Sequence, residues 1–519
     1  YPTLLKQAGY YVTNNEKTDY NTSSFDKEIW DECSHTATYT NRAPGQPFFA
    51  VFNVLVSHES QIFEKWYPKS KRYPEAKTPP DKIRIPPYQV KTPETILDWQ
   101  RMYDRLADMD AQVGLRLRDL KNSGEADNTI VVYCSDHGGI TLRTKRYLYD
   151  SGTRVPFIVY VPEKWRHLAP GAPGSISDRL VQFLDMPRTF LSLAGVHPPD
   201  RMTGRIFMGE HTEPAPETVF LYADRFDEGP GISRAVTDGR WKYIRNFQPY
   251  RSRYLMIAYP LNQSGQFSQT MEYQAGRTDA IQSAIFEPLP PEELYDLQVD
   301  PDEIYNLVDD PANADPLARL RLQLDEKILS ARDTGFIPEP MMASINCIRG
   351  KTIYDFAQGP ERYPLPEVLE FAKVASSRDP AVLPELRRNL TNPNVIFRYW
   401  AVSGLRSLGG EAKPAVADLQ RALEDRNSVV RIHAAVALAE FGERDQSLAF
   451  LLKEARRAGT DAEALWALDG LRYLDAPELL KDVPAKEVVR GSQSNIAYKA
   501  LKRGLSTHHV PDSLNPKGK

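Results

Sequence analysis

One short stretch, residues 129–138, constrains the fold of this chain more than any other. Its first six residues, Thr-Ile-Val-Val-Tyr-Cys, show no helical spacing, and Ser-Asp and Gly-Gly follow them. This pattern predicts a buried strand that ends in a turn. Asp136 and His137 lie in that turn. In an α/β sheet, ligands bind at the carboxyl ends of the strands, so the turn is a candidate site.

Asp136 and His137 are candidate ligands of a divalent metal ion, because carboxylate oxygen and imidazole nitrogen are both common metal donors. Lys145 adds a cation on the loop that follows. The three side chains could hold a metal ion and an oxyanion side by side. Asp-His-Gly is also a common turn, in which Asp136 caps its own backbone and Gly138 supplies a positive φ. The Asp-His-Gly motif alone favours an ordinary turn, whereas the flanking segments raise the case for a metal site.

The segments on both sides of this stretch carry a wider pattern. Residues 96–120 have the apolar spacing of a long amphipathic helix, which Asn-Ser-Gly at 122–124 ends. Downstream, Lys145 is followed by Asp-Ser-Gly at 150–152 and Arg-Val-Pro at 154–156. Together these motifs resemble the type I sulfatases of the alkaline phosphatase superfamily, which use a formylglycine nucleophile.

The resemblance implies an α/β fold, an alkaline-phosphatase-like α/β/α sandwich with a small antiparallel C-terminal subdomain. We place the sandwich at residues 1–215 and the subdomain at 216–335. In the subdomain, Asp-Gly at 238–239 predicts a hairpin turn, and Glu-Leu-Tyr-Asp-Leu at 293–297 is similar to the closing motif of the family. Residues 336–363 are expected to form a linker.

From about residue 364 the composition changes to Ala, Leu and Arg with helical spacing. A pattern around Arg398 recurs around Arg431, and an offset of 33 residues is typical of stacked helical units. It resembles HEAT repeats. Residues 364–507 are therefore predicted to be an all-α solenoid, and residues 508–519 a disordered tail.

Solenoid units contact mainly their neighbours, so we expect the sulfatase core to fold without the repeats. Phe397, Tyr399 and Trp400 cluster more aromatic surface than one helix pair would ordinarily bury. We expect these three side chains to contact the core or a partner. The repeats could also bind a protein or a polysaccharide.

The sulfatase resemblance assigns catalytic roles to three further side chains. His58 ends an apolar strand pattern and matches a histidine that contacts the sulfate and could protonate the leaving group. Lys145 would bind sulfate oxygens, and Lys17 would orient the nucleophile. Asp19 stands where the family has a histidine. An acid cannot act as a cation at neutral pH, so the role of Asp19, as a substrate contact or otherwise, stays open.

Four arginine and aspartate side chains could complete the substrate cleft. Arg143 lies on the loop of Lys145, and the others fall where the antiparallel subdomain could reach the cleft. They are Arg143, Arg225, Asp227 and Arg234.

The resemblance also implies a divalent metal ion held in part by Asp136 and His137. Calcium is usual in the family, but an imidazole where the pattern often has an amide leaves manganese or zinc open. The family nucleophile is a Cys or Ser in Cys/Ser-x-Pro-x-Arg, which is oxidised to formylglycine. Neither a serine nor any of the three cysteines, Cys33, Cys134 and Cys347, has that context.

We therefore expect the nucleophile, and an N-terminal Asp pair that completes the metal site, to lie outside this sequence. The chain as given is then expected to be inactive alone. It begins inside a helix pattern and without Met, so we interpret it as a fragment whose resemblance covers about two thirds of a sulfatase.

The expected function is the hydrolysis of a sulfate ester or sulfamate on a glycan or a related small molecule. Lys-Thr-Asp-Tyr-Asn at 17–21 is similar to the matching segment of bacterial heparan N-sulfatase-like proteins. Two alternatives stay open: a phosphodiesterase or phosphonate hydrolase of the same superfamily, and a non-catalytic scaffold that binds through the repeats.

Composition limits the partners. A chain of 519 residues, with 41% hydrophobic and 26% charged residues, is typical of a globular protein with more than one folding unit. A net charge of −4 argues against nucleic acid as the main partner. No apolar stretch approaches the length of a membrane span. The family resemblance implies a periplasmic or secreted location.

Overall fold

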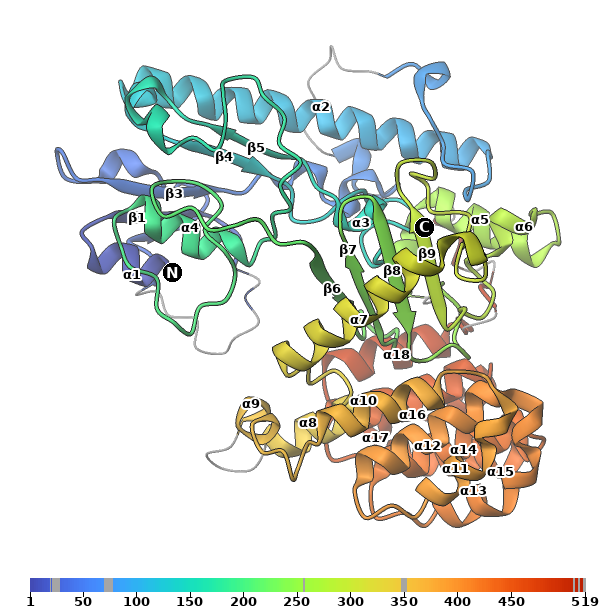
Figure 1. The fold of residues 1–519 in the computed structure, drawn as a ribbon. Helices are drawn as coiled ribbons and strands as arrows, with labels where there is room; N and C mark the ends of the chain where they lie inside the picture. Colours follow the sequence, from blue (N-terminus) through green and yellow to red (C-terminus); the bar gives the residue numbers. More distant parts are fainter. Residues whose placement is uncertain are drawn as a thin grey trace.

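The chain folds into three parts that follow one another in sequence: an α/β part, an antiparallel sheet with its helices, and an array of helices (Figure 1). Among the helices of the described residues, none combines the length and the apolar character that crossing a membrane requires. The computed structural model describes residues 1–18, 20, 29–69, 78–254, 257–346, 352–506, 509–511 and 514–516.

Parallel strands open the α/β part. Helix α1 (Pro2–Gln7) leads into β1 (Tyr11–Asn15), which lies between β2 (Glu32–Cys33) and β3 (Phe48–Phe52) and pairs in parallel with both. Buried apolar side chains from α1 and β1 belong to one cluster. The helix therefore packs on a face of this sheet.

Helix α2 (Pro93–Asn122) is the long amphipathic helix that its spacing predicts. It begins after Thr92, whose side chain accepts a hydrogen bond from the backbone N–H of Thr95. Asp98 on its buried face accepts a hydrogen bond from the first turn of α5 (Ser264–Gln274), at 2.6 Å from Gly265 N. The α/β part and the second part are therefore in direct contact.

The strand predicted at residues 129–134 is β4 (Val131–Cys134), which pairs antiparallel with β5 (Phe157–Tyr160). The prediction of full burial is wrong, because β4 is half-buried along its length and belongs to a sheet of two strands in the described part of the chain. Ile158 and Tyr160 on β5 are exposed. Helix α4 (Asp185–Leu193) follows.

A tight backbone contact fixes the turn after β4. The N–H of Gly138 donates to the carbonyl oxygen of Gly152 in helix α3 (Asp150–Thr153), at 2.8 Å. A Cβ on Gly138 would lie 2.1 Å from a backbone oxygen of α3, which only glycine avoids. The turn that carries the two candidate metal ligands is thus held against the loop that carries Lys145.

The second part is a four-stranded antiparallel sheet in the order β6-β7-β8-β9. The predicted hairpin is confirmed: Asp238 and Gly239 form its turn, and the Asp238 carboxylate accepts hydrogen bonds from two backbone N–H groups of the turn. Helix α7 packs on one face of the sheet through four buried aliphatic side chains. The elements are β6 (Val219–Ala223), β7 (Ser233–Thr237), β8 (Trp241–Asn246), α5, α6 (Ala280–Ser283), β9 (Glu292–Asp296) and α7 (Ala314–Ala331).

The third part is an array of short helices, and its repeat is visible in the hydrogen bonds. Asn394 and Asn427 each cap a helix by accepting from the backbone N–H two residues on. Arg398 and Arg431 each donate to the carbonyl oxygen six residues earlier and pair with an acid. The helices, after α8 (Glu339–Asn346) and α9 (Ile353–Ala357), are α10 (Leu365–Ala375), α11 (Leu383–Asn389), α12 (Val395–Leu408), α13 (Val416–Ala422), α14 (Ser428–Glu440), α15 (Arg444–Arg457), α16 (Asp461–Tyr473), α17 (Ala485–Val488) and α18 (Ser492–Lys502).

The helical array shares its hydrophobic core with the antiparallel subdomain. The side chain of Trp400 is fully buried, and its Nε1–H donates to the carbonyl oxygen of Phe336 at 3.1 Å. Tyr399 is also buried and accepts a hydrogen bond from Gln248 at 2.8 Å. One cluster of buried apolar side chains continues from β7 and β8 into the array. The expectation of a core that is independent of the repeats is therefore contradicted, because separation would expose this shared surface.

Two finer expectations also change. Phe397 stacks on Phe371 of α10, with ring centroids 5.5 Å apart, so it packs within the array. In the described part of residues 508–519, Val510 and Leu514 are buried in a cluster with Tyr254. These apolar side chains dock on the second part, whereas composition alone predicted a disordered tail.

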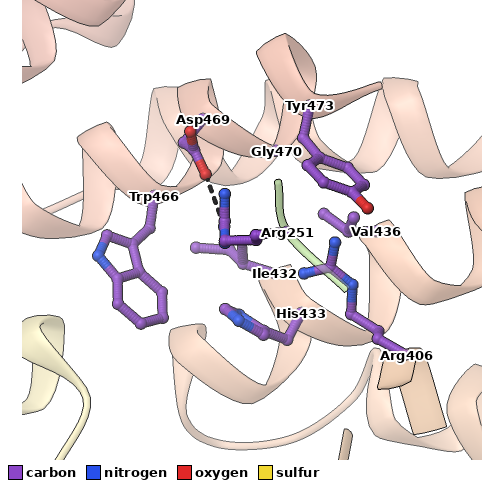
Figure 2. A pocket seen from close by; sticks show the side chains of 9 residues that line it. All are labelled: Arg251, Arg406, Ile432, His433, Val436, Trp466, Asp469, Gly470 and Tyr473. Carbon is purple, nitrogen blue, oxygen red and sulfur yellow. Dashed lines mark hydrogen bonds and ion pairs between the residues drawn. The ribbon is translucent and has the colours of Figure 1, made fainter. Parts of the chain in front are cut away.

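A small buried cavity of about 10 Å³ lies where the subdomain meets the array (Figure 2). Arg251, which follows β8, reaches into the array and pairs with Asp469 on α16 at 2.8 Å. Arg406, His433 and Tyr473 also line the cavity. Charged groups of both parts therefore meet in a buried junction.

Burial, and after it the cations of Arg406 and Arg251, lower the pKa of His433 well below its usual value. His433 is therefore neutral in the folded protein, while the unfolded chain binds the proton below about pH 6.5. Because the unfolded state then holds more protons, stability is complete above about pH 6.5 and is lost as the pH falls.

His433→Phe should remove this loss. Between about pH 6.5 and pH 5, the free energy of unfolding of the wild type should fall by up to about 1.4 kcal/mol per pH unit more than that of the variant. Phenylalanine can keep the contacts with Tyr399 and Trp466, whose ring centroids lie 4.9 and 5.0 Å away. Urea denaturation across this pH range measures the free energy of unfolding of both proteins. Parallel dependence on pH in the wild type and the variant would contradict the neutral state of His433.

Candidate functional site

His58, Lys17, Lys145 and the pair Asp136 and His137 come together at strand ends. Lys17 follows β1, His58 follows the turn after β3, and the pair follows β4. Burial lowers the pKa of His58, and the neighbouring charge of Lys145 adds to this effect, whereas Glu59 acts to raise it. Residues that are far apart in the sequence thus form one site.

Asp136 and His137 present two donors to the same place. His137 Nε2 lies 3.8 Å from a carboxylate oxygen of Asp136. His137 Nδ1 lies 3.0 Å from the carbonyl oxygen of Gly138, and because a carbonyl oxygen only accepts, Nδ1 carries the proton. The lone pair of the neutral imidazole is then on Nε2, next to the carboxylate, which is the state that metal ligation requires.

The electrostatics of this pair agree with ligation. Burial acts to raise the pKa of Asp136, but His137 and Lys17 outweigh it, so the pKa is lowered and the carboxylate stays charged. Burial lowers the pKa of His137 and keeps its ring neutral. Over the described ranges, no group of three or more His, Cys, Asp or Glu side chains could hold a metal ion, so the structure places no complete metal site around this pair.

Lys17 is a close neighbour of Asp136. Its Nζ is 3.6 Å from the Asp136 carboxylate, and its carbonyl oxygen accepts a hydrogen bond from the Asn14 side chain at 3.0 Å. Asn14 is buried on β1, so the strand fixes the backbone of this loop. Asp19, which was a candidate for substrate contact, lies outside the described residues.

Glu59 is a site residue that sequence reasoning missed. Its side chain is 1% exposed and accepts two hydrogen bonds from the guanidinium of Arg146, at 2.7 and 3.0 Å. Lys145 Nζ lies 3.5 Å from the same carboxylate. Burial acts to raise the pKa of Glu59, but Arg146 and Lys145 lower it overall. An acid directly after His58 and an arginine directly after Lys145 were the available signals.

Two of the predicted substrate-binding arginines have structural partners instead. Arg143 is buried and donates to the carbonyl oxygens of Asp302 and Glu303, at 2.6 and 2.5 Å. Arg234 is buried on β7 and pairs with Asp333 at 2.5 Å and with Asp224 at 2.9 Å. Their guanidinium groups join parts of the fold, so the structure does not support substrate contact for either.

Arg225 and Asp227 lie on the loop between β6 and β7. Arg225 pairs with Glu339 at 2.6 Å and also donates to the carbonyl oxygen of Asp227. Asp227 faces the site, with its carboxylate 3.6 Å from the guanidinium of Arg146. Of the subdomain candidates, Asp227 is thus the one that reaches the candidate site.

Family models account for most of the chain. Residues 5–196 match the sulfatase model, and residues 138–256 match the model of the C-terminal part of N-sulphoglucosamine sulphohydrolase. These residues of the chain are therefore similar to sulfatases. Residues 383–472 match the model of HEAT repeats. The sulfatase resemblance and the predicted repeats are confirmed.

Individual sulfatases are similar over parts of their length. An ulvan-active sulfatase of Formosa agariphila is 36% identical over 367 residues, which are 64% of this chain and 60% of that protein. Human N-sulphoglucosamine sulphohydrolase is 30% identical over 270 residues, 48% of this chain and 51% of that protein. The chain thus spans between half and two thirds of the length of these sulfatases.

The chain is also similar to a solved structure of a protein in complex with its substrate D-glucosamine-2-N,6-O-disulfate. The matched region covers 64% of this chain and 82% of the chain in that structure. The sequence identity is 16% and the TM-score is 0.44. Sulfatases generally use a divalent metal ion and a formylglycine nucleophile.

Proposed function

We propose that this protein hydrolyses sulfate esters or sulfamates on a sulfated glycan, with a formylglycine nucleophile supplied from outside the sequence described here. The observation that carries this proposal is the meeting of His58, Lys145 and the Asp136 and His137 pair beyond the ends of strands β3 and β4, in the part of the chain that is similar to sulfatases. Two similar sulfatases carry names that refer to ulvan and to N-sulphoglucosamine, which supports a glycan as the substrate.

Lys145 is the group that would bind sulfate oxygens. Its side chain is mostly buried, and its Nζ lies 3.5 Å from the carboxylate of Glu59, which also pairs with Arg146. An ammonium group held in a partly desolvated site stabilises the charge that develops on oxygen as the ester bond breaks. Lys17, whose ammonium lies 3.6 Å from the Asp136 carboxylate, would orient the nucleophile.

His58 would contact the sulfate through Nε2. Its Nδ1 accepts from the backbone N–H of Ser60 at 3.3 Å and lies 2.8 Å from the Ser60 hydroxyl. An accepting Nδ1 places the proton of the neutral ring on Nε2. His58 can then donate a hydrogen bond from Nε2–H to a sulfate oxygen or to the leaving oxygen.

Asp136 and His137 would supply two ligands to the metal ion, with the others outside the described residues. When bound, the ion polarises the sulfate and orients the nucleophile. We propose calcium, with manganese or zinc as the alternatives that an imidazole ligand allows.

Asp136→Ala should lower the metal content of the complete protein, because it removes the charged ligand of the pair. Elemental analysis of the purified protein measures this without any assay of activity. Asp127→Ala is the matched control, since Asp127 is exposed in the short helix before β4. Equal metal content in both variants would refute the assignment. His137→Asn should favour calcium over softer ions, because it replaces nitrogen by oxygen.

The domain boundaries and the location are also proposals. The first proposed boundary lies between residues 215 and 216, just before strand β6 begins. The second lies after residue 335, just beyond the end of helix α7. Helix α10 opens the array at the third boundary, residue 364. A periplasmic or secreted location would bring the enzyme to an extracellular polymer, and cell fractionation tests it.

A further inference from the structure

The loop between β6 and β7, residues 224–232, lies between the candidate site and the helical array. Its ends are fixed by the sheet, where β6 and β7 pair from Val219 to Ala223. Within the loop, the backbone groups of Phe226 and Gly229 bond to each other in both directions, at 3.0 and 2.8 Å. Asp227 has a φ of +47°, a conformation that side chains other than glycine rarely adopt. Surrounding contacts must therefore hold this loop in place.

On the side of the candidate site, the loop is held by Arg146. The Arg146 guanidinium lies 3.6 Å from the Asp227 carboxylate and 4.9 Å from the ring centroid of Phe226. The same guanidinium makes both hydrogen bonds to Glu59. Glu59 in turn lies 3.5 Å from Lys145. Asp227 therefore connects to Lys145 through two buried charged groups.

On the other side, the loop is held by helix α16 of the array. Arg472 is fully buried and donates to the carbonyl oxygen of Glu228 at 2.9 Å. Its guanidinium also lies 3.8 Å from the Glu228 carboxylate. Glu228 is itself fully buried and accepts from the backbone N–H of Ala258 at 2.7 Å. From α18, Gln493 accepts a hydrogen bond from Arg225 at 3.4 Å.

Asp469, which lines the buried junction of Figure 2, orients Arg472. Asp469, one turn before it on α16, accepts from Arg472 at 3.0 Å and from Arg251 of the subdomain at 2.8 Å. The carboxylate thus fixes the two guanidinium groups relative to each other. Since Arg251 and Arg472 belong to different parts of the fold, the position of Arg472 depends on the docking of the array.

A cavity lies beside the loop. Its volume is about 70 Å³, and Arg146, Tyr149, Asp224, Ile232 and Arg251 are among the side chains that line it. Close packing is therefore incomplete on this side, and the charged contacts of Asp227 and Glu228 determine where the loop lies.

We propose that the helical array positions Lys145 through the β6–β7 loop, with Arg472 as the positioning residue. The path runs from Arg472 to Glu228 and Asp227, and from there through Arg146 and Glu59 to Lys145. The effect of this path on turnover rests on the proposed function, whereas its effect on the position of the loop does not. The repeats are then part of the support of the site, in addition to any contact with a polymer.

The first test is hydrogen exchange of residues 225–229 in the full chain. Arg472→Met removes the contacts with Glu228, so exchange of the loop amides should become at least about threefold faster. Arg431→Met is the matched control, because Arg431 pairs with Glu454 at 2.6 Å inside the array and breaks the same kind of ion pair. Equal exchange of the loop in the two variants would overturn the proposal.

The second test is the rate at which an acylating reagent modifies Lys145, measured by mass spectrometry. Arg472→Met and Asp227→Asn should both change this rate relative to Arg431→Met. Asp227 is partly exposed, so Asp227→Asn keeps the test informative if Arg472→Met does not fold. An unchanged rate in Asp227→Asn would also overturn the path.

The third test uses the complete enzyme and a small sulfate ester. Arg472→Met should lower kcat by between about 3- and 30-fold with a smaller change in KM, and Arg431→Met should not. The double variant with Asp227→Asn should lose less than the product of the two single losses, because both act on one path. A wild type that turns over no sulfate ester would refute the proposed function, while the exchange and the labelling still decide the positioning role.

Discussion

Replacing Lys145 with alanine should lower kcat for a small sulfate ester by about 10²- to 10³-fold in the complete enzyme. Lys145 is the cation that we assign to the sulfate oxygens, and it reaches them from a partly buried position beside Glu59. A donor that is fixed before the reaction stabilises developing charge more than water does, so its loss acts mainly on the transition state. Steady-state kinetics with an aryl sulfate measures the effect.

Lys164→Ala is the control for this prediction. Lys164 lies in the short helix after β5, where its ammonium bonds to the exposed Asn128 side chain at 2.6 Å. Its loss removes one positive charge from the same part of the chain and should leave kcat unchanged. Equal losses in the two variants would mean that overall charge matters and that Lys145 has no special place.

Trp400→Ala should lower the free energy of unfolding by about 3 to 5 kcal/mol. Trp400 is fully buried, and its ring lies 6.1 Å from that of Phe247 and 6.0 Å from that of Phe336. Both partners belong to segments outside the array, so the cavity would open where the subdomain and the array meet. Urea denaturation of the variant, followed by fluorescence and by circular dichroism, measures the loss.

Tyr354→Ala is the matched aromatic control, because Tyr354 on α9 is 68% exposed. Its effect should stay within about 0.5 kcal/mol. If the array unfolded in Trp400→Ala while the antiparallel sheet kept its stability, the two parts would not share one core.

The elements of the fold were predictable where the signal is local. The spacing of residues 96–120 matches α2, and the Asp-Gly turn at 238–239 joins β7 to β8. The offset between Arg398 and Arg431 reflects one hydrogen-bonding pattern that occurs twice. In each case, neighbouring residues determine the structure.

Long-range pairing was not predictable in this way. Arg146 meets Glu59 across 87 positions of the sequence, and Arg234 meets Asp333 across 99. A charged side chain looks the same in the sequence whether it binds substrate or joins two parts of the fold. This is why Glu59 was missed and why Arg143 and Arg234 were assigned to the substrate.

The relation between the array and the core was also beyond the sequence pattern. Helical spacing shows which positions of α12 are buried, but it does not show what covers them. Tyr399 and Trp400 were correctly singled out as docking residues, whereas the independence of the core was not. The repeat signal describes contacts between neighbouring units and contains no information on contacts with another domain.

Hydrolysis of an aryl sulfate and of an aryl phosphodiester by the complete protein, measured side by side, tests the proposed sulfatase function most directly. The higher kcat/KM should be for the sulfate, and Lys145→Ala should abolish most of that activity. Turnover of the phosphodiester without turnover of the sulfate would contradict a sulfatase and favour a phosphodiesterase or phosphonate hydrolase of the same superfamily. No turnover of either, from a protein with an intact nucleophile, would favour a binding scaffold.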